Sequence, residues 1–292
     1  MMFVILGPTS SGKSDYAIRL AQEIGGEIIS VDSRQVYRGM DIGTGKVPRD
    51  TSQDPTEGFF SEGIRHHLID VASPKREYNV THFLRDAKKA ATDIEKRGKV
   101  PILCGGTAFW VEALLSGTSF PEVKPDKMLR AKLDTLSAEA LFEMLQEKDP
   151  ERAANIDAKN KVRLIRALEI VERLGKVPRL GRQKRKTDCD IIILNPEKAV
   201  LHERIERRLK ERLEQGMIDE VKRLHDEGVS WERLEEFGLE YRWCTRFLQG
   251  KISREEMEAE LLKDTKHYAK RQLTFLRRLE RAGLTLEWEK AI

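Results

Sequence analysis

The sequence predicts an α/β fold that is built on a parallel sheet and interrupted by a small helical insertion. Two segments, 3–24 and 99–115, share a pattern of an apolar strand, a glycine-containing turn and an amphipathic helix. This alternation indicates βα units and a parallel sheet. The alternation then stops and gives way to thin apolar stripes on charged helices. We therefore expect a core formed by residues 1–117 and 187–292 and an insertion formed by residues 118–186.

Composition sets broad limits on the class of protein. The 292 residues are enough for one large domain or two modest ones. Charged residues make up 35%, but the net charge is only +4, so the placement of basic residues must decide whether nucleic acid is a partner. The three cysteines have neither disulfide nor metal spacing, which suits the cytoplasm. The chain has no apolar run near the ~20 residues of a membrane span, so we expect no membrane partner. The first residues run directly into an expected strand, so we expect no targeting peptide.

A phosphate-binding loop follows the first expected strand, residues 3–6. Four residues separate two glycines, and a lysine and a hydroxyl residue follow, which is the pattern of a loop that cradles phosphates. Its backbone N–H groups and the next helix N-terminus face an anion, Lys13 adds charge, and the Ser14 hydroxyl is placed to hold Mg²⁺. We expect a phosphate or diphosphate ligand with Mg²⁺ as cofactor. The loop consists of Gly7, Pro8, Thr9, Ser10, Ser11, Gly12, Lys13 and Ser14.

Two further strand ends carry candidate functional residues. Asp32 follows an expected strand at 27–31, and Thr107 follows another at 99–104 and two glycines. Ligands of open α/β sheets bind outside the carboxyl ends of the strands, so both residues should lie near the phosphate loop. A turn or cap aspartate and a helix N-cap threonine remain the alternative interpretations.

The segment between these strand ends is expected to be mostly loop. Glycine and proline punctuate residues 39–63, and a short extended segment follows at 65–71. Neighbouring residues of a strand point to opposite faces, so we interpret His66 and His67 as structural rather than as a metal pair. Thr81 can cap the helix that follows.

The insertion contains two helical patterns, around residues 138–146 and 161–174. Their spacing puts three arginines, Arg163, Arg166 and Arg173, on one helical face. A basic run, Arg182, Lys184, Arg185 and Lys186, comes next. A charge run is usually a solvated face, so a nucleic-acid role needs a second argument.

The last third of the chain resumes the core. An apolar strand at 190–194 precedes an expected helix start at Asn195-Pro196, and one long stripe at helical spacing extends from Leu201 to Leu224. The closing segment, residues 266–278, interleaves basic and aromatic residues, which suits backbone phosphates and stacked bases. An amphipathic closing helix is the alternative, and one helix can be both.

A series of sequence blocks resembles one family, the tRNA dimethylallyltransferases or isopentenyl-tRNA transferases. The resemblance covers nearly the whole chain, and the Asp-Ser-x-Gln-x-Tyr block in series with the others makes it specific. The chain has no Cys/His cluster like the C-terminal zinc finger of larger eukaryotic members, so it resembles the bacterial form. The blocks are the phosphate loop, residues 32–37, Asp41-Ile42-Gly43-Thr44-Gly45-Lys46, residues 66–70, Gly105-Gly106-Thr107, residues 163–169, residues 238–242 and Lys270-Arg271-Gln272-Leu273-Thr274.

The resemblance implies a P-loop, nucleotide-kinase-like α/β core whose helical insertion grips a tRNA anticodon stem-loop. It implies transfer of a dimethylallyl group from dimethylallyl diphosphate to N6 of the adenosine 3′ of the anticodon, with release of diphosphate. We expect the chain to act as a monomer. Phe109 and Trp110 could form the apolar wall for the prenyl group, although packing within the helix is an equal use for either.

The resemblance also assigns roles to individual residues. Asp32 resembles the general base, Thr107 the residue that contacts base and diphosphate, and Lys13 joins them in catalysis. The donor cradle is implied to consist of residues Gly7 to Ser14 with Arg208. The implied tRNA contacts are Asp32, Ser33, Arg34, Gln35, Thr107, Arg130, Val162, Arg163, Leu164, Ile165, Arg166, Lys270, Arg271 and Arg277.

Three other functions share parts of this pattern. A small-molecule kinase has the phosphate loop and the strand-end aspartate, and an enzyme that prenylates free adenine nucleotides has the donor site. Neither needs the basic insertion or the basic closing segment. A nucleotide-gated RNA-binding switch would be expected to carry a second nucleotide motif, and the sequence has no Asn-Lys-x-Asp. A donor screen with ATP, GTP and dimethylallyl diphosphate separates these possibilities.

Overall fold

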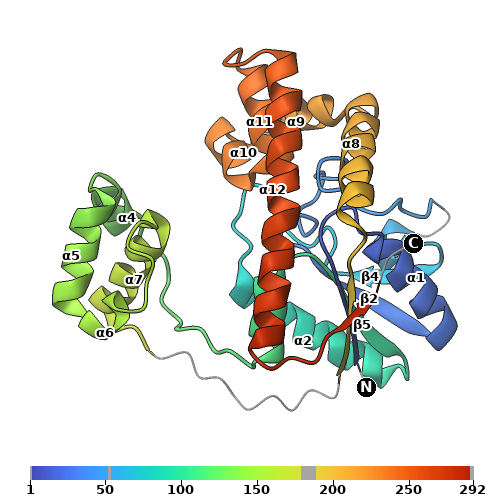
Figure 1. The fold of residues 1–292 in the computed structure, drawn as a ribbon, viewed down its shortest axis with the longest axis horizontal. Coiled ribbons are helices and arrows are strands. Elements are labelled where there is room, and N and C mark those ends of the chain that lie inside the picture. The colour runs from blue at the N-terminus through green and yellow to red at the C-terminus, as the bar shows by residue number, and fades with distance from the viewer. Residues whose placement is uncertain (1, 52–53, 179–188, 290–292) are drawn as a thin grey trace. The chain divides into compact units, whose positions relative to one another are not determined.

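A computed structural model describes residues 2–51, 54–178 and 189–289. These residues form two compact units, one made of 2–115 with 189–289 and the other of 116–178. The first unit is α/β and the second is helical (Figure 1). Within the described residues, no helix combines the length and apolar character needed to cross a bilayer.

The first unit is built around a sheet whose strand order is β3-β4-β2-β5-β1-β6-β7. All neighbouring strands are parallel except β3 and β4, which confirms the predicted fold class. The two short strands β3 and β7 were not expected. The described strands are β1 (Met2–Leu6), β2 (Gly26–Val31), β3 (Phe59–Ser61), β4 (Ile64–His67), β5 (Val100–Gly105), β6 (Cys189–Leu194) and β7 (Glu287–Glu289).

The strand order brings three functional turns together. β5 lies between β1 and β2, and Gly105 at its end pairs with Leu6 of β1 and Val31 of β2. Three turns therefore lie side by side at the carboxyl ends of the central strands: the phosphate loop, the turn at Asp32 and the turn at Gly106-Thr107. This is the edge at which ligands of open α/β sheets bind.

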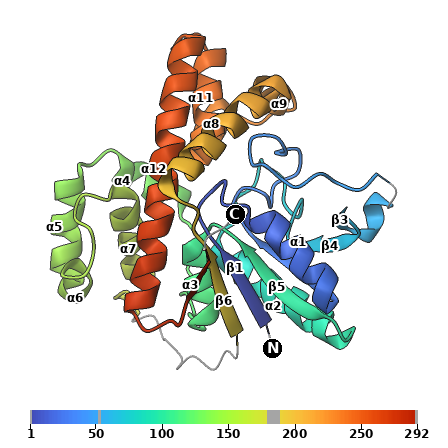
Figure 2. The ribbon, with the colours of Figure 1, turned by 45° about the vertical axis from the view of Figure 1, so that its right-hand side comes forward.

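Helices cover the sheet on both faces (Figure 2). Alternate residues of the central strands, such as Ile5 and Ile28, pack on Ala17 and Ile18 of α1, because side chains alternate across a strand. α2 and α3 contact β2 from the other side. The helices of this unit are α1 (Lys13–Ile24), α2 (Val80–Lys96), α3 (Ala108–Leu115), α8 (Lys198–Glu214), α9 (Met217–Asp226), α10 (Trp231–Phe237), α11 (Leu239–Leu248) and α12 (Arg254–Arg281), with a 3₁₀ turn η1 (Pro55–Glu57).

The closing segment is a long helix, as predicted. α12 has 28 residues, begins with a capping box at Ser253, and contacts α3, α8 and α11 (Figure 1, red). Two expected helix starts were wrong. Asn79 rather than Thr81 caps α2, and α8 begins at Lys198 rather than at Asn195-Pro196.

The long stripe from Leu201 to Leu224 also divides into two helices, which was not expected. Gly216 lies between α8 and α9 with a left-handed φ of 95°, a conformation that glycine adopts without steric cost. The apolar spacing continues across this break, so periodicity alone did not reveal it.

The second unit has its own core. The thin apolar stripes meet in one cluster that includes Leu133, Leu141, Leu145, Leu164 and Leu168. Its helices are α4 (Lys127–Asp134), α5 (Ala138–Lys148), α6 (Pro150–Ala153) and α7 (Lys161–Leu174). The sequence predicted α5 and α7 but missed α4 and α6. The basic run at 182–186 lies outside the described residues.

Candidate active site

A cavity of about 890 Å³ lies at the carboxyl edge of the sheet. The phosphate loop and the turn after β2 form part of its wall, and residues 43–48 form another part. Arginines of α8, residues 237–241, and Tyr268 and Gln272 of α12 also line it. Segments far apart in the chain thus meet around one space.

The phosphate loop has the backbone of an anion cradle. Ser10 and Gly12 have φ values of 62° and 85°, which fold the loop back before α1. A Cβ on Gly7 would lie 2.6 Å from Ser11 Oγ and 2.7 Å from the Leu194 carbonyl oxygen, so this position requires glycine. The first-turn N–H groups of α1 have no acceptors within the helix and are available to an anion.

Two positively charged side chains, Lys13 and Arg208, lie at this loop and form only long hydrogen bonds there. Lys13 Nζ donates to the Pro8 carbonyl at 3.3 Å, and desolvation lowers the pKa of Lys13. Arg208 donates to Ser10 Oγ at 3.2 Å and to Thr9 Oγ1 at 3.4 Å. Burial, followed by repulsion from Arg212, lowers the pKa of Arg208 to about 10. The cavity therefore holds desolvated positive charge that a multiply charged anion would neutralise.

Asp32 and Thr107 lie in neighbouring turns that are tied together. Asp32 Oδ1 accepts from the N–H groups of Arg34 at 2.8 Å and Gln35 at 3.3 Å, and its side chain lines the cavity. The structure thus shows the turn role of Asp32, whose Oδ1 accepts both of these bonds. Thr107 Oγ1 accepts from the N–H of Ser33 at 3.1 Å. The cavity wall there is formed by Gly105 and Gly106 rather than by Thr107.

Arg34 and Gln35, in the turn after β2, line the cavity and form hydrogen bonds to other segments. Arg34 Nε donates to the Phe237 carbonyl at 2.7 Å, and the guanidinium lies 5.5 Å from the Phe237 ring centroid. Gln35 donates to the Gly45 carbonyl at 3.2 Å and accepts from Ser30 Oγ at 3.0 Å. Both side chains therefore fix the walls of the cavity.

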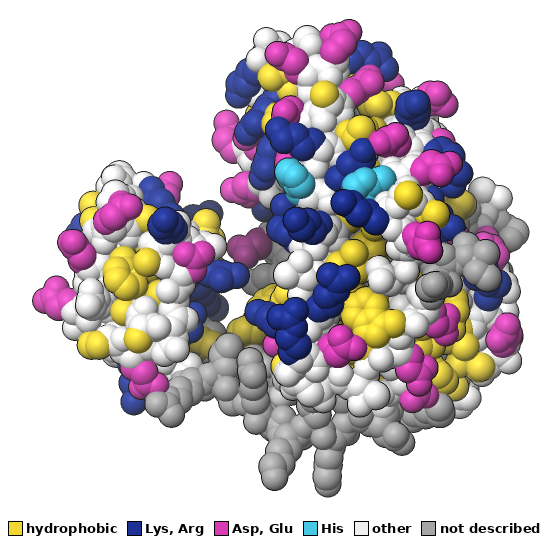
Figure 3. Space-filling view, in the orientation of Figure 1, with side chains coloured by type: hydrophobic (Ala, Val, Ile, Leu, Met, Phe, Trp, Pro, Cys, Tyr) yellow, Lys and Arg dark blue, Asp and Glu magenta, His cyan; other side chains and the backbone are white. Residues whose placement is uncertain are grey.

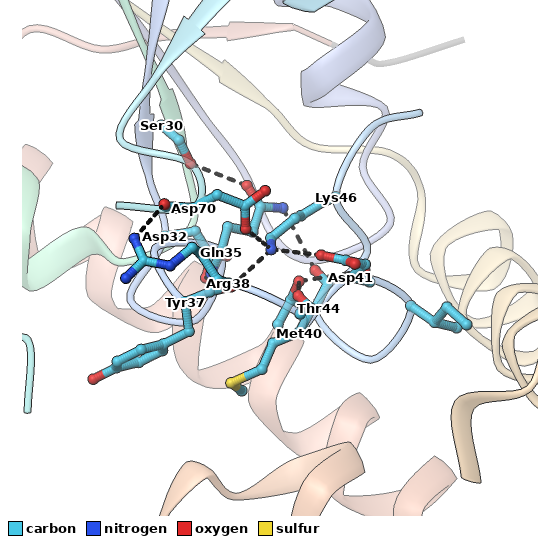
Figure 4. A network of polar contacts seen from close by, with 12 residues as sticks. Ser30, Asp32, Gln35, Tyr37, Arg38, Met40, Asp41, Thr44, Lys46 and Asp70 are labelled. Carbon is cyan, nitrogen blue, oxygen red and sulfur yellow. Dashed lines mark hydrogen bonds and ion pairs between the residues drawn. The ribbon is translucent and has the colours of Figure 1, made fainter. Parts of the chain in front are cut away.

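A network around Lys46 holds the loop 41–46 (Figure 4). Lys46 Nζ contacts carboxylate oxygens of Asp41, at 2.7 Å, and Asp70, and it donates to the Tyr37 carbonyl at 2.7 Å. The buried Glu220 carboxylate accepts from three amides of the loop, Asp41 and Ile42 at 2.7 Å and Gly43 at 3.0 Å. This loop is therefore rigidly placed at the cavity wall.

The sequence analysis missed Glu220 and Arg212 as site residues. Arg212 donates to the Gly43 carbonyl at 3.2 Å and pairs with Glu240 at 2.7 Å. Each lies about 170–180 positions from the loop it contacts. No local sequence pattern predicts either residue, because each acts through a contact that is distant in the chain.

The apolar wall of the cavity is not the one expected. Trp110 is buried and stacks on Phe83 with ring centroids 4.7 Å apart, so the packing interpretation is correct for it. Phe109 is 48% exposed and does not line the cavity either. The apolar lining instead includes Ile28, Val47, Pro48, Ile69, Leu194, Phe237 and Leu239.

The predicted RNA residues of α12 lie on more than one side of the helix. Lys270 and Arg277 line a groove of about 810 Å³ beside α8, on a face where lysine and arginine side chains gather (Figure 3). Arg271 is exposed, with its guanidinium 5.8 Å from the centroid of the Tyr268 ring. Tyr268 and Gln272 line the main cavity. The helix thus separates an outer basic face from an inner face toward the site.

In the second unit, the predicted RNA residues divide into exposed and internal ones. Arg130 bonds the buried Glu169 carboxylate with two nitrogens, at 2.7 and 2.9 Å, and Arg166 bonds it at 3.2 Å. Leu164 and Ile165 are 0% and 8% exposed, so their side chains belong to the insertion's core, and their predicted contact with RNA stays a prediction. Val162, 79% exposed, and Arg163 remain on the surface.

The metal-binding capacity of the site is modest. The described residues contain no group of three or more His, Cys, Asp or Glu side chains that could hold a metal ion. Ser14 lines the cavity, and the buried Ser11 Oγ has no hydrogen-bond partner. Mg²⁺ keeps several waters and binds through one or two protein groups plus phosphate oxygens. The donor set therefore fits Mg²⁺ that binds together with a diphosphate.

These features define the class of protein. It is a P-loop protein with an NTPase-like α/β core, and positively charged side chains at the strand ends form a site for an anion. The chain belongs to the IPP transferase family, whose model matches residues 35–279. A second model, described as isopentenyl transferase, matches residues 1–62.

Relatives and solved structures agree with this family. The chain is 42% identical to tRNA dimethylallyltransferase 2 of Citrifermentans bemidjiense, over 98% of this chain and 90% of that one. It superposes on a full-length tRNA isopentenylpyrophosphate transferase of Bacillus halodurans with a TM-score of 0.70 and 33% identity, covering 99% of this chain and 89% of that one. A eukaryotic dimethylallyltransferase acting on tRNA gives a TM-score of 0.81 at 27% identity, covering 99% and 74%.

Proposed function

We propose that this protein transfers a dimethylallyl group from dimethylallyl diphosphate to N6 of the adenosine on the 3′ side of the anticodon in tRNA. The names of its relatives support tRNA as the substrate. The observation that carries the donor half is the pair Lys13 and Arg208, both held at the phosphate loop with lowered pKa values. A diphosphate would satisfy both cations and the free N–H groups of α1. We further propose that the protein acts as a cytoplasmic monomer.

The diphosphate is the leaving group, so catalysis requires its charge to be neutralised. Lys13, Arg208 and the loop amides are arranged to do this in a partly desolvated cavity, where such contacts are stronger than in water. Mg²⁺, held by Ser14 and the phosphate oxygens, would supply further charge neutralisation. The bond between the allylic carbon and oxygen breaks, and its electron pair leaves with the diphosphate.

The acceptor amine is a weak nucleophile, because its lone pair is delocalised into the adenine ring. Asp32 follows β2, which is separated by one strand, β5, from the strand that leads into the phosphate loop. A carboxylate within hydrogen-bond reach of N6 would accept its proton as the new carbon–nitrogen bond forms. Thr107 supports this turn through Ser33 rather than by reaching into the cavity. We therefore assign Asp32 as the general base and Thr107 as a residue that positions it.

The adenosine must leave the anticodon-loop stack, which costs a few kcal/mol that backbone contacts must offset. We assign these contacts to Val162 and Arg163 of the second unit and to Lys270, Arg271 and Arg277 of α12, all of which are exposed. Arg130 and Arg166 act through the insertion's own structure, since both are bonded to Glu169.

The test is a reaction with purified protein, Mg²⁺, dimethylallyl diphosphate and an anticodon stem-loop that has adenosine at the target position. We expect diphosphate release and a five-carbon addition that mass spectrometry of the digested RNA places on that adenosine. A stem-loop with guanosine there, which lacks an N6 amine, is the matched control. Phosphate transfer from ATP without a prenyl product would establish a kinase instead. Light scattering of the purified protein tests the monomer.

A further inference from the structure

One buried side chain of α12 connects the phosphate loop with the turn after β5. Gln272 is 7% exposed. Its Oε1 accepts from the N–H of Thr9 at 2.8 Å, and its Nε2 donates to the carbonyl of Gly106 at 3.0 Å. The bonded residues lie 263 and 166 positions away in the chain. These two bonds tie α12 to two turns that leave the neighbouring strands β1 and β5.

From this observation we propose that Gln272 is a positioning residue, which sets the donor loop in register with the acceptor turn. The inference rests on the proposed function and deepens it. Thr9 belongs to the proposed donor cradle, and Gly106 is next to Thr107, which is proposed to position the base. The Thr9 side chain accepts from Arg208 at 3.4 Å, and Gly106 precedes Thr107.

The chain of contacts continues to the proposed base. Thr107 Oγ1 accepts from the N–H of Ser33 at 3.1 Å, and Ser33 follows Asp32. A shift of the Gln272 amide would thus move the donor cradle relative to the Asp32 turn. Misplacement of reacting groups by about 1 Å can cost roughly 10²-fold in rate. Both polar atoms of the amide are bonded to the protein backbone, so the amide acts on the reaction through alignment.

Gly106 shows how closely the amide is fitted. A Cβ added there would lie 2.3 Å from Gln272 Nε2, which is closer than real contacts allow. Beyond the Gln272 side chain, the nearest atom would be the Gly7 carbonyl oxygen at 3.7 Å, an ordinary contact. The φ of Gly106 is not among the left-handed values, so alanine suits the backbone. Gly106→Ala therefore acts as a selective displacement of Gln272.

The position of Gln272 also gives α12 two roles. Lys270 and Arg271, its exposed neighbours, are proposed RNA contacts on the same turn of helix. The residues that meet RNA and the residue that fixes the donor loop therefore belong to one rigid segment. Bound RNA would hold the segment from which the donor loop is fixed.

The first experiment uses Gln272→Met, which keeps the side-chain volume and removes both hydrogen bonds. We expect the single-turnover rate, at saturating donor and stem-loop, to fall about 10–100-fold, with stem-loop affinity within about twofold of wild type. We expect the affinity for Mg²⁺ and diphosphate, measured by calorimetry, to fall about threefold or more. Glu255→Gln, an exposed change on the first turn of α12, is the control and should match wild type.

The second experiment is a double-mutant cycle of Gly106→Ala and Gln272→Ala. Gly106→Ala should lower the rate and diphosphate affinity in the wild-type background and have little effect once Gln272 is alanine, because the clash is gone. Equal effects in both backgrounds, or Gln272→Met within threefold of wild type in both measurements, would overturn the inference. The diphosphate measurements test the role of Gln272 even if no RNA is prenylated. A lack of prenylation would contradict only the proposed function.

Discussion

Replacing Arg208 by methionine is expected to leave the ligand-free protein at least as stable and to remove much of its response to diphosphate. Burial is the largest cause of the fall in the pKa of Arg208 from 12.5 to about 10. At 1.36 kcal/mol per pKa unit this is about 3 kcal/mol, which partial exposure reduces to about 1–2 kcal/mol. The folded-state pKa lies below the unfolded value, so this cost is fully present below about pH 10.

The hydrogen bonds that methionine would lose offset part of this gain. Arg208 bonds Ser10 and Thr9 at 3.2 and 3.4 Å, which are long contacts to partly exposed hydroxyls. Together they stabilise the fold by about 1 kcal/mol. The net change in the free energy of unfolding should therefore lie between zero and about 1 kcal/mol. For a chain of this size the melting temperature should rise by up to about 2–4 °C.

Thermal denaturation at pH 7, with and without Mg²⁺ and diphosphate, measures both effects. A ligand at one hundred times its Kd stabilises the wild type by about 2.7 kcal/mol, and the variant should gain much less at the same concentration. Lys210→Met is the matched control, since Lys210 is exposed on the same helix. A melting temperature lowered by more than about 4 °C with an unchanged diphosphate response would show that Arg208 is a structural residue and refute the reasoning.

Three further predictions separate the parts of the site. Lys13→Ala should abolish turnover and weaken donor binding in calorimetry while stem-loop binding survives; equal losses of both affinities would contradict this division. Asp32→Asn should lower the single-turnover rate at least ~10²-fold with near-normal donor binding, and a wild-type rate would remove Asp32 as the base. Arg163→Ala should reduce the salt slope of stem-loop binding by roughly 0.7–0.9, whereas Arg166→Ala should mainly lower the stability of the insertion, because Arg166 bonds the buried Glu169. An unchanged slope for the first variant would mean that this face is only solvated.

The features that the sequence predicted are those that local order determines. The strand–loop–helix of the phosphate site is contiguous, and parallel strands place Asp32 and Gly106 beside it. The edge strands β3 and β7 were not predicted, because each has only three residues. The position of Trp110 could not be predicted, because its partner Phe83 lies on another helix and periodicity does not say which element a face meets.

The same reasoning explains why the residues that shape the cavity were harder to find. Glu220, Arg212 and Gln272 each act on a loop that is far away in the chain. A glutamate, an arginine and a glutamine on helices look like ordinary surface residues in the sequence. Only the tertiary contacts show that Glu220 and Gln272 are buried amide-bonding groups. Side chains that position loops are therefore the part of a site that sequence reasoning predicts least well.

The phosphate-loop site departs from the rules that the rest of the chain follows. Ser10 has a positive φ, Ser11 Oγ is buried without a partner, and Lys13 and Arg208 are desolvated with only neutral oxygens as hydrogen-bond acceptors. Elsewhere the buried carboxylates Glu27, Glu169 and Glu220 are fully engaged by cations or amides. Such local violations persist where the surrounding fold determines them, and they mark functional sites. An anion that neutralises Lys13 and Arg208 would meet a site already arranged for it, so its binding energy would not be spent on rearranging the protein.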